Sequence, residues 1–162
     1  MIKEIGREDF KEALDLVNRV FTEFVAIDYG DAGRKTFHDY LEHKYEDVLS
    51  QVESGSKAFW GYYENGKLAS VLAVRNETHI ALLFTDKQYQ GKGMARSLFD
   101  TMLKSLNPAV EEVTVNSSPF AVPIYEKLGF IPIGPMQEQN GIRFTPMRFH
   151  LKGCLLYTSR CV

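Results

Sequence analysis

The stretch HIALLFTDKQYQGKGMARSLFDTMLKSLN (79–107) joins an apolar segment, a glycine-containing loop and an amphipathic segment. Residues 79–85 are apolar enough to form a strand that is buried on both faces. After the loop, apolar residues recur at four-residue spacing, which predicts a helix; they are Met94, Leu98, Met102 and Leu106. With the strand predicted at 111–116, this is a strand–helix–strand unit, which requires parallel strands and a right-handed crossover. The loop QGKGMA (90–95) is therefore expected at the carboxyl end of a central strand.

Further strands and helices are predicted around this unit. Strands are expected at 1–5, 57–63, 67–75, 130–134 and 142–151, with a hairpin turn at Asn65-Gly66 and a polar turn at 137–141. Helices are expected from Asp9 to about Phe24, between Gly33 and Gly55, and at 118–129 with Ser118 as N-cap and Pro119 in the first turn. The order β-α-α-β-β-β-α-β-α-β-β predicts an α/β protein with a mixed sheet of about seven strands and about four helices.

The composition is that of one soluble globular domain, because 162 residues are too few for two. The formal net charge is −2 and no basic block exceeds two residues, which argues against nucleic acid or an anionic membrane as partner. The segment MIKEIGREDF (1–10) lacks the apolar core of a signal peptide, so a cytoplasmic location is expected. Both cysteines, Cys154 and Cys161, lie in a tail at 153–162 that we interpret as a disordered end or a cloning remnant. The domain is expected to span 1–152.

A glycine-containing loop at a helix start is a natural anion site, because the first N–H groups are unpaired and the helix dipole is positive there. Phosphate is the expected ligand, and three loop types compete with a plain strand-to-helix turn. A Walker loop requires four residues between its glycines, whereas one residue separates Gly91 from Gly93. A dinucleotide loop requires glycine where Arg96 stands and an acid where Asn116 stands. The third pattern, Gln/Arg-x-x-Gly-x-Gly/Ala, is met by QGKGMA.

This third pattern resembles the coenzyme A loop of the GNAT acyltransferases, the Gcn5-related N-acetyltransferase superfamily. The segment NSSPFAVPIYEKLGF (116–130) is similar to the second coenzyme A segment of that family, with a tyrosine followed by Glu-Lys-Leu-Gly-Phe. The order of elements over 1–151 also fits. The resemblance implies a sheet with two splayed central strands and an acyltransferase that moves acetyl from acetyl-CoA directly to a primary amine. The acceptor would be a small molecule, a peptide N-terminus or a lysine.

The resemblance also implies which residues contact the coenzyme A moiety. Backbone amides would hold the pyrophosphate; they belong to Gly91, Lys92, Gly93, Met94, Ala95 and Arg96. The strand end Leu83, Phe84 and Thr85 would pair with the pantetheine arm like an added strand. Asn116 and Ser118 would contribute from the second segment. Family members usually carry proline where Lys87 stands and often asparagine where Ser118 stands, and neither departure removes a backbone donor.

Acetyl transfer to an amine needs a base for the ammonium proton, a donor for the oxyanion and an acid for the departing thiolate. Tyr125 matches the family tyrosine that commonly protonates the thiolate, and this role is favoured over that of an amphipathic helix tyrosine that serves only the core. The oxyanion donor is expected to be the strand N–H near Phe84 or Thr85. His79 stands where histone-acetylating relatives carry a catalytic glutamate, and alternation places it on the face of Leu83 and Thr85. Further base candidates are Glu23, Asp28 and Glu77.

The amine acceptor is expected between the loop at 26–36 and the last hairpin, where Asp28, Tyr29 and Asp31 could receive a cation. No metal is expected, because the histidines have no ligand companions at useful spacing. The sequence leaves a homodimer open. Two other functions compete with acetyl transfer. One is a coenzyme A-binding sensor of the same fold without turnover, and the other is a dinucleotide-dependent oxidoreductase, against which Arg96 and Asn116 argue.

Overall fold

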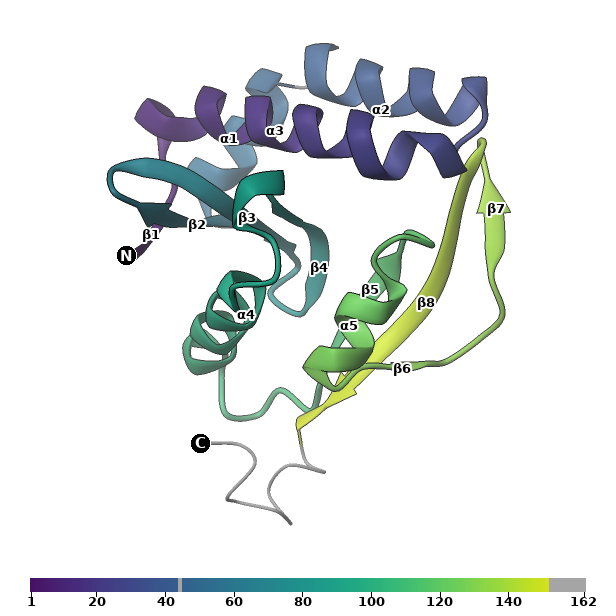
Figure 1. The fold of residues 1–162 in the computed structure, drawn as a ribbon. Coiled ribbons are helices and arrows are strands. Elements are labelled where there is room, and N and C mark those ends of the chain that lie inside the picture. Colours follow the sequence, from purple (N-terminus) through teal and green to yellow (C-terminus); the bar gives the residue numbers. More distant parts are fainter. Residues whose placement is uncertain (44, 152–162) are drawn as a thin grey trace.

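A computed structural model of the chain describes residues 1–43 and 45–151, with only the backbone of Asp28 and His43 (Figure 1). The predicted tail at 153–162 lies outside the described residues. The strands are β1 (Ile2–Glu4), β2 (Lys57–Glu64), β3 (Lys67–Arg75), β4 (His79–Thr85), β5 (Glu112–Ser117), β6 (Ile131–Pro132), β7 (Gln137–Gln139) and β8 (Ile142–His150). The helices are α1 (Arg7–Val20), α2 (Asp31–His43), α3 (Tyr45–Ser54), α4 (Met94–Ser105) and α5 (Val122–Leu128). Short turns of other helix types are η1 (Phe21–Val25), η2 (Ala26–Asp28) and η3 (Lys87–Tyr89).

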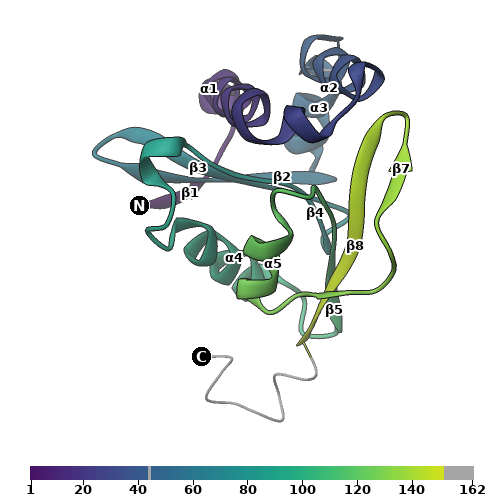
Figure 2. The ribbon, with the colours of Figure 1, turned by 45° about the vertical axis from the view of Figure 1, so that its right-hand side comes forward.

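The strands form one mixed sheet in the order β1-β2-β3-β4-β5-β8-β6, with β7 paired to β8. Helices α1, α2 and α3 lie on one face of this sheet, and α4 and α5 lie on the other (Figures 1 and 2). We call these the α1 face and the α4 face. Each face has its own apolar core, centred on Phe10 and Phe59 under α1 and on Leu98 and Phe99 under α4. None of the helices in the described part of the chain is long and apolar enough to span a membrane.

The two central strands, β4 and β5, separate soon after they begin. They pair in parallel only at His79 with Thr114 and at Ile80 with Val115. Beyond these positions β4 continues beside β3 and β5 continues beside β8, so the carboxyl halves of the two strands diverge. The predicted mixed α/β sheet with splayed central strands is confirmed.

Several predicted boundaries are wrong for local reasons. The helix predicted between Gly33 and Gly55 is two helices, and the first already begins at Asp31. The helix expected to begin near Gly91, α4, begins at Met94, because Gly93 has φ 82°, a left-handed conformation outside the helical range. Helix α5 begins at Val122 and not at Ser118, since 118–121 forms a turn in which Ala121 and Val122 donate to the carbonyl of Ser118.

The polar segment predicted as a turn at 137–141 contains an additional strand, β7. Only Asn140 and Gly141, with φ 54° and 79°, form the turn, and this two-residue geometry aligns the flanking residues as a hairpin. The other predicted hairpin turn is confirmed, with φ 51° at Asn65 and 79° at Gly66. Strand β6 is shorter than predicted and keeps only Ile131–Pro132.

Candidate active site

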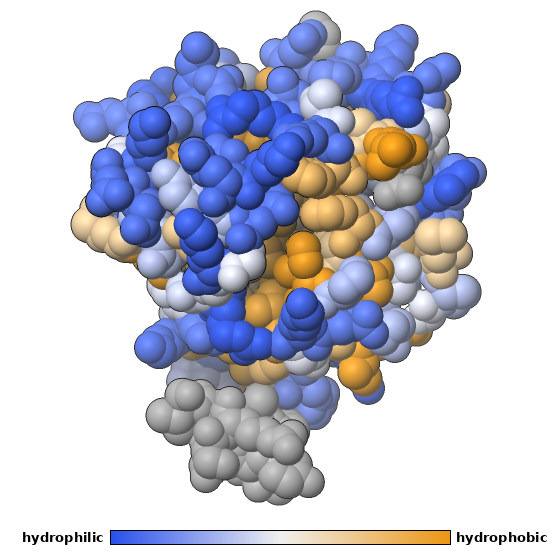
Figure 3. All heavy atoms as spheres, in the orientation of Figure 1, coloured by the Kyte–Doolittle hydropathy of each residue, from blue (hydrophilic) through white to orange (hydrophobic). Residues whose placement is uncertain are grey.

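A cavity of about 500 Å³ lies where β4 and β5 separate. Its floor is β4, with Ala81, Leu82, Leu83 and Phe84 among the lining residues. One wall comes from β5 and the start of α5, and contributes Asn116, Ser117, Ser118 and Tyr125. The opposite wall comes from η1 and α2, and the β7–β8 hairpin closes the side. Figure 3 shows apolar side chains in a hollow in the middle of the molecule, with hydrophilic residues around it.

The loop before α4 has the geometry of an anion site. Gly91 and Gly93 both have left-handed φ angles, 77° and 82°, which glycine adopts without strain. The first N–H groups of α4, from Met94 to Arg96, have no carbonyl four residues earlier within the helix. The Gln90 side chain donates to the carbonyl of Thr85 at 3.0 Å and so fixes the loop to the end of β4.

The backbone of β4 presents alternate N–H groups to the cavity side. The N–H of Asp86 donates to the carbonyl of Ala69, and in an antiparallel ladder every second pair exchanges such bonds. From the register, the N–H of Phe84 is therefore used by β3, whereas those of Leu83 and Thr85 point toward β5. The oxyanion donor predicted near Phe84 or Thr85 cannot be the N–H of Phe84. Leu83 and Thr85 remain as candidate donors.

The residues predicted to contact coenzyme A divide into two groups. Leu83, Phe84, Asn116 and Ser118 line the cavity, and Gly91 to Arg96 form the loop and first turn that follow it. The side chain of Thr85 bonds the hydroxyl of Ser70 at 2.8 Å, so only its backbone faces the cavity side. Met94 is buried in the core, and the guanidinium of Arg96 donates to the carbonyl of Lys127 at the end of α5. Met94 can therefore contribute only its backbone N–H group.

Tyr125 lies on α5 and lines the cavity while its ring is almost fully buried, at 4% exposure. The ring packs edge-on against Phe130, with centroids 5.3 Å apart. Burial raises the pKa of its hydroxyl, so the group is protonated at neutral pH. Tyr125 therefore combines a position in the cavity wall with a protonated hydroxyl, which the predicted proton donor requires.

His79 lines the cavity, but not from the face that alternation predicts. A register shift between Ala73 and Val74 pairs His79 with Arg75. The neighbouring residue Ile80 belongs to the α4 core, so His79 points to the α1 face, opposite to Leu83. Its Nδ1 lies 2.8 Å from the hydroxyl oxygen of Thr114. Burial, and then the charge of Arg75, lower the pKa of His79, so its imidazole is neutral at pH 7 and able to accept a proton.

The other predicted base and acceptor residues are mostly elsewhere. Asp31 is exposed and pairs with Arg34 at 3.4 Å, and Glu23 pairs with Lys87 at 2.9 Å. Glu77 lies in the exposed turn between β3 and β4. Tyr29 does line the cavity. The side chain of Asp28 lies outside the described residues.

Sequence reasoning missed several side chains of the cavity. These are Phe37 and Tyr40 on α2, Phe144 on β8, and Lys57 and Arg75 at one end of the cavity. Lys57 begins β2 and Arg75 ends β3. The sequence did contain a signal for them, because three successive predicted strands each carry a basic residue at one end: Lys57, Arg75 and His79.

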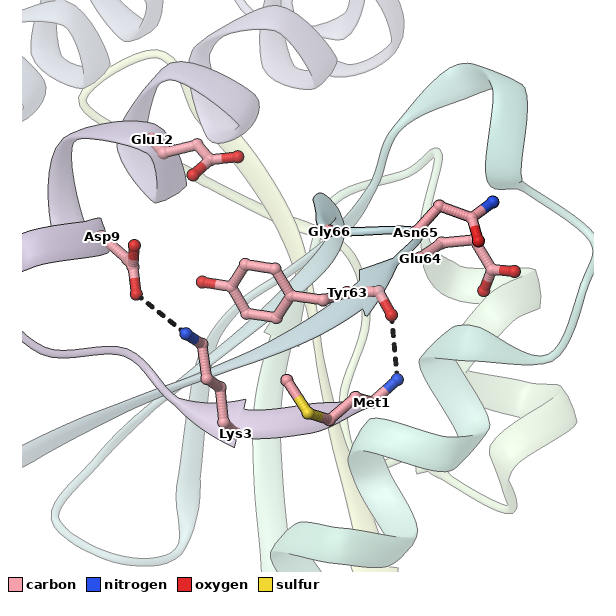
Figure 4. A pocket seen from close by; sticks show the side chains of 8 residues that line it. All are labelled: Met1, Lys3, Asp9, Glu12, Tyr63, Glu64, Asn65 and Gly66. Carbon is pink, nitrogen blue, oxygen red and sulfur yellow. Dashed lines mark hydrogen bonds and ion pairs between the residues drawn. The ribbon is translucent and has the colours of Figure 1, made fainter.

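A second cavity, of about 540 Å³, shares no lining residue with the first and lies between β1, α1 and the β2–β3 hairpin (Figure 4). Its charged groups interact with one another, since Lys3 pairs with Asp9 at 3.2 Å and lies over the ring of Tyr63. The hydroxyl of Tyr63 points between Asp9 and Glu12, and burial together with these carboxylates raises its pKa to about 12. Among the described residues, no three potential metal ligands of His, Cys, Asp or Glu type cluster together.

Solved structures of similar fold include a GCN5-related N-acetyltransferase from Rhodopseudomonas palustris, with a TM-score of 0.76 and 16% identity, covering 93% of this chain and 95% of that one. The PaiA N-acetyltransferase of Thermoplasma acidophilum, in complex with coenzyme A, has a TM-score of 0.70 and 16% identity over 93% and 98% of the two chains. The spermidine N-acetyltransferase of Vibrio cholerae, in complex with coenzyme A and spermine, has a TM-score of 0.68 and 16% identity over 96% and 97%. At such identities these likenesses show the fold. The search of curated proteins gave no match.

The sequence itself matches a known family. Residues 25–151 match the family model described as "Acetyltransferase (GNAT) domain". The matched region contains β4, the loop before α4, and α5 with Tyr125. The chain belongs to the GNAT acetyltransferase family.

Proposed function

We propose that this protein transfers the acetyl group of acetyl-CoA directly to a primary amine, without an acetylated enzyme intermediate. The observation that carries the proposal is the position of Tyr125, His79 and the free edge of β4 around one cavity. The loop before α4 supplies the anion site for the pyrophosphate at one end of that edge. The coenzyme A complexes of structural neighbours support this choice of co-substrate.

In the proposed reaction the amine nitrogen attacks the thioester carbon, and the C–S bond breaks after a tetrahedral intermediate. His79 accepts a proton from the amine, since its lowered pKa keeps it neutral. The N–H of Leu83 or Thr85 stabilises the oxyanion. Tyr125 gives its proton to the thiolate sulfur and is reprotonated by the second proton that the ammonium group loses.

Thermal unfolding with and without ligands tests the cofactor assignment. A ligand that binds only the native state at 100 times its Kd stabilises by about 2.7 kcal/mol, which for this chain length raises Tm by roughly 5–10 °C. Acetyl-CoA is expected to produce such a rise and NAD to produce none. A larger rise with NAD would instead support a dinucleotide enzyme.

Turnover requires a second measurement, because a coenzyme A-binding sensor of this fold would give the same thermal shift. Thiol release from acetyl-CoA should be followed with a panel of primary amines of the three acceptor classes: small molecules, peptide N-termini and lysine side chains. The transferase proposal requires at least one amine to accelerate thiol release above the rate of hydrolysis. Binding without any amine-dependent release would favour the sensor.

A further inference from the structure

Four basic residues and one threonine form a row, which we call the basic row, across five adjacent strands. The strand register places Lys57 opposite Arg75, Arg75 opposite His79, His79 opposite Thr114, and Thr114 opposite Arg148. Residues that are directly opposite in neighbouring strands point to the same face of a sheet, with their Cβ atoms about 5 Å apart. The row therefore lies on the α1 face, where His79 points.

Three members of this row line the candidate active site: Lys57, Arg75 and His79. Because His79 is neutral at pH 7, the charged residues among the described side chains that line this end of the cavity are Lys57 and Arg75. Lys57 and Arg75 are directly opposite each other in the sheet, and like charges in that arrangement are destabilising. The Nζ of Lys57 donates to the hydroxyl of Tyr40 at 3.5 Å and lies 5.5 Å from the centroid of its ring. No aspartate or glutamate is among the described side chains that line the cavity.

The opposite wall of the cavity is aromatic. Phe21 stacks on Phe37 with ring centroids 3.8 Å apart, and Tyr29 meets Phe21 edge-on at 5.1 Å. Phe144 of β8 closes the side. The acceptor end of the cavity therefore combines two cations, a neutral imidazole and an apolar wall. That combination suits a ligand with an anionic group and an apolar body, and it opposes a polycation.

We infer, on the basis of the proposed function, that the acceptor is an α-amino acid with an apolar or aromatic side chain. Its carboxylate binds Arg75 and Lys57, and the guanidinium fork suits a carboxylate in two-point contact. Its amine lies at His79, which is directly opposite Arg75 in the sheet. As direct partners in the sheet, the two side chains start about 5 Å apart, which suits an amine and a carboxylate on the same carbon. Its side chain packs against the wall of Phe21 and Phe37.

The transfer balances with these groups. The bound amino acid is an ammonium ion, and two of its protons leave. One passes through His79 to solvent, and the other replaces the proton that Tyr125 gives to the thiolate. A C–N bond forms, the thioester C–S bond breaks, and the products are an N-acetyl amino acid, free coenzyme A and one proton.

Matched pairs of amines that differ only in the carboxylate test this inference. The pairs are L-phenylalanine with phenethylamine, L-leucine with isoamylamine and L-tryptophan with tryptamine, and spermidine serves as the polycation. For the wild type, kcat/KM should favour the amino acid of the preferred pair by about 10- to 100-fold, the range expected for a charge-assisted hydrogen bond. Spermidine should be a poor acceptor.

Variants of Arg75 assign the preference to the residue. Arg75→Gln should reduce the preference by about 10-fold or more through KM of the amino acid, with KM of acetyl-CoA unchanged, and Arg75→Lys should restore part of it. Arg75→Glu should invert it in favour of the amine without a carboxylate. Lys104→Gln, on α4 and exposed, removes a positive charge outside the cavity and should keep the preference. Arg75 is exposed at a strand end, so these variants should fold, which thermal unfolding checks.

A binding measurement gives a readout besides turnover. The Kd of 3-phenylpropionate, which carries the carboxylate without the amine, should be about 10-fold weaker for Arg75→Gln than for wild type, and unchanged for Lys104→Gln. Equal acetylation of both members of every pair, or preferred acetylation of spermidine, would overturn the inference and leave the transferase proposal standing. If no amine accelerates thiol release, the transferase proposal fails and the inference about its acceptor fails with it.

Discussion

Arg75 and His79 face each other as direct partners across β3 and β4, on the face of the sheet that forms the candidate active site. Burial is the main cause that lowers the pKa of His79, and the positive charge of Arg75 is the second. The pair therefore couples two roles. Arg75 attracts an anionic group, and its charge also keeps the neighbouring imidazole in the neutral form that accepts protons.

This coupling predicts an NMR titration. The ring resonances of His79, assigned by comparison with His79→Gln, should titrate with a pKa below the ordinary value of about 6.5. In Arg75→Gln the pKa should rise toward 6.5, because a neighbouring positive charge no longer opposes protonation. A lowered folded-state pKa means that the contribution of His79 to stability is present above pH 6.5 and lost as pH falls through the folded pKa. Wild type should thus lose more stability in that window than His79→Gln. An unchanged titration in Arg75→Gln would show that the arginine does not act on the histidine.

The contact between Gly33 and Gly141 predicts a stability effect. Gly33 on α2 lies against the turn between β7 and β8, and a Cβ on either glycine would overlap the backbone of the other. In Gly33→Ala, overpacking should lower the free energy of unfolding by about 1–3 kcal/mol. The higher helix propensity of alanine should offset about 1 kcal/mol of this loss. Urea unfolding measures the change.

Gly30→Ala is the matched control for this contact. A Cβ at Gly30 meets nothing within 4 Å, and its φ is not in the left-handed range. Its free energy of unfolding should stay within about 0.5 kcal/mol of wild type, as for an ordinary surface substitution. Equal losses in the two variants would mean that helix α2 does not depend on this close approach.

The fold was predictable where local patterns and tertiary packing agree. The strand–loop–helix unit at 79–107 has apolar periods that change from strand to helix at a glycine loop, and the structure has the same elements. It was less predictable to which face of the sheet each side chain points, because β-bulges shift the register of the strands. An unbroken hairpin from Asn65-Gly66 would pair Lys57 with Val74, but the shift between Tyr62 and Tyr63 pairs it with Arg75.

The same effect explains which parts of the candidate site the sequence could show. The loop at 90–95 and Tyr125 lie in contiguous motifs and could be located by pattern alone. His79 was found, but on the wrong face, since the shift between Ala73 and Val74 is not encoded in a local pattern. The basic row requires four strand pairings, two of them between strands that are not connected by a hairpin, to be known at once. No single window of sequence contains it.

The coenzyme A loop predicts an order of effects for two neighbouring substitutions. Gly93→Val should weaken coenzyme A binding more than Lys92→Ala, because φ at Gly93 is 82° and a β-branched residue resists that conformation. Space is not the obstacle, since a Cβ at Gly93 meets nothing within 4 Å. The Nζ of Lys92 lies 5.7 Å from the ring centroid of Tyr89, on an exposed surface, so its removal should cost little. Calorimetric titration of coenzyme A into both folded variants gives the order. A larger loss for Lys92→Ala would show that the lysine charge, and not the backbone, holds the phosphates.

Tyr125→Phe separates catalysis from packing at the same residue. The ring would still pack against Phe130 in the core, so coenzyme A affinity and the fold should be kept. Only the hydroxyl is removed, and with it the proposed proton donor to the thiolate. The value of kcat should fall by about 10²- to 10⁴-fold, the range of a positioned general acid. Steady-state rates at saturating acetyl-CoA, with an amine that accelerates thiol release, measure this change.

Tyr63→Phe is a matched control for the loss of a buried tyrosine hydroxyl. Tyr63 is also buried, at 8% exposure, and lines the second cavity, which shares no residue with the first. This variant should keep the wild-type kcat, because its hydroxyl is in the other cavity. If Tyr125→Phe loses stability but turns over at the wild-type rate per folded molecule, Tyr125 is a core residue and the thiolate takes its proton from water. A loss of kcat confined to Tyr125→Phe, with KM for acetyl-CoA unchanged, is the result that a proton donor requires, because the hydroxyl then acts on the departing thiolate and not on cofactor binding.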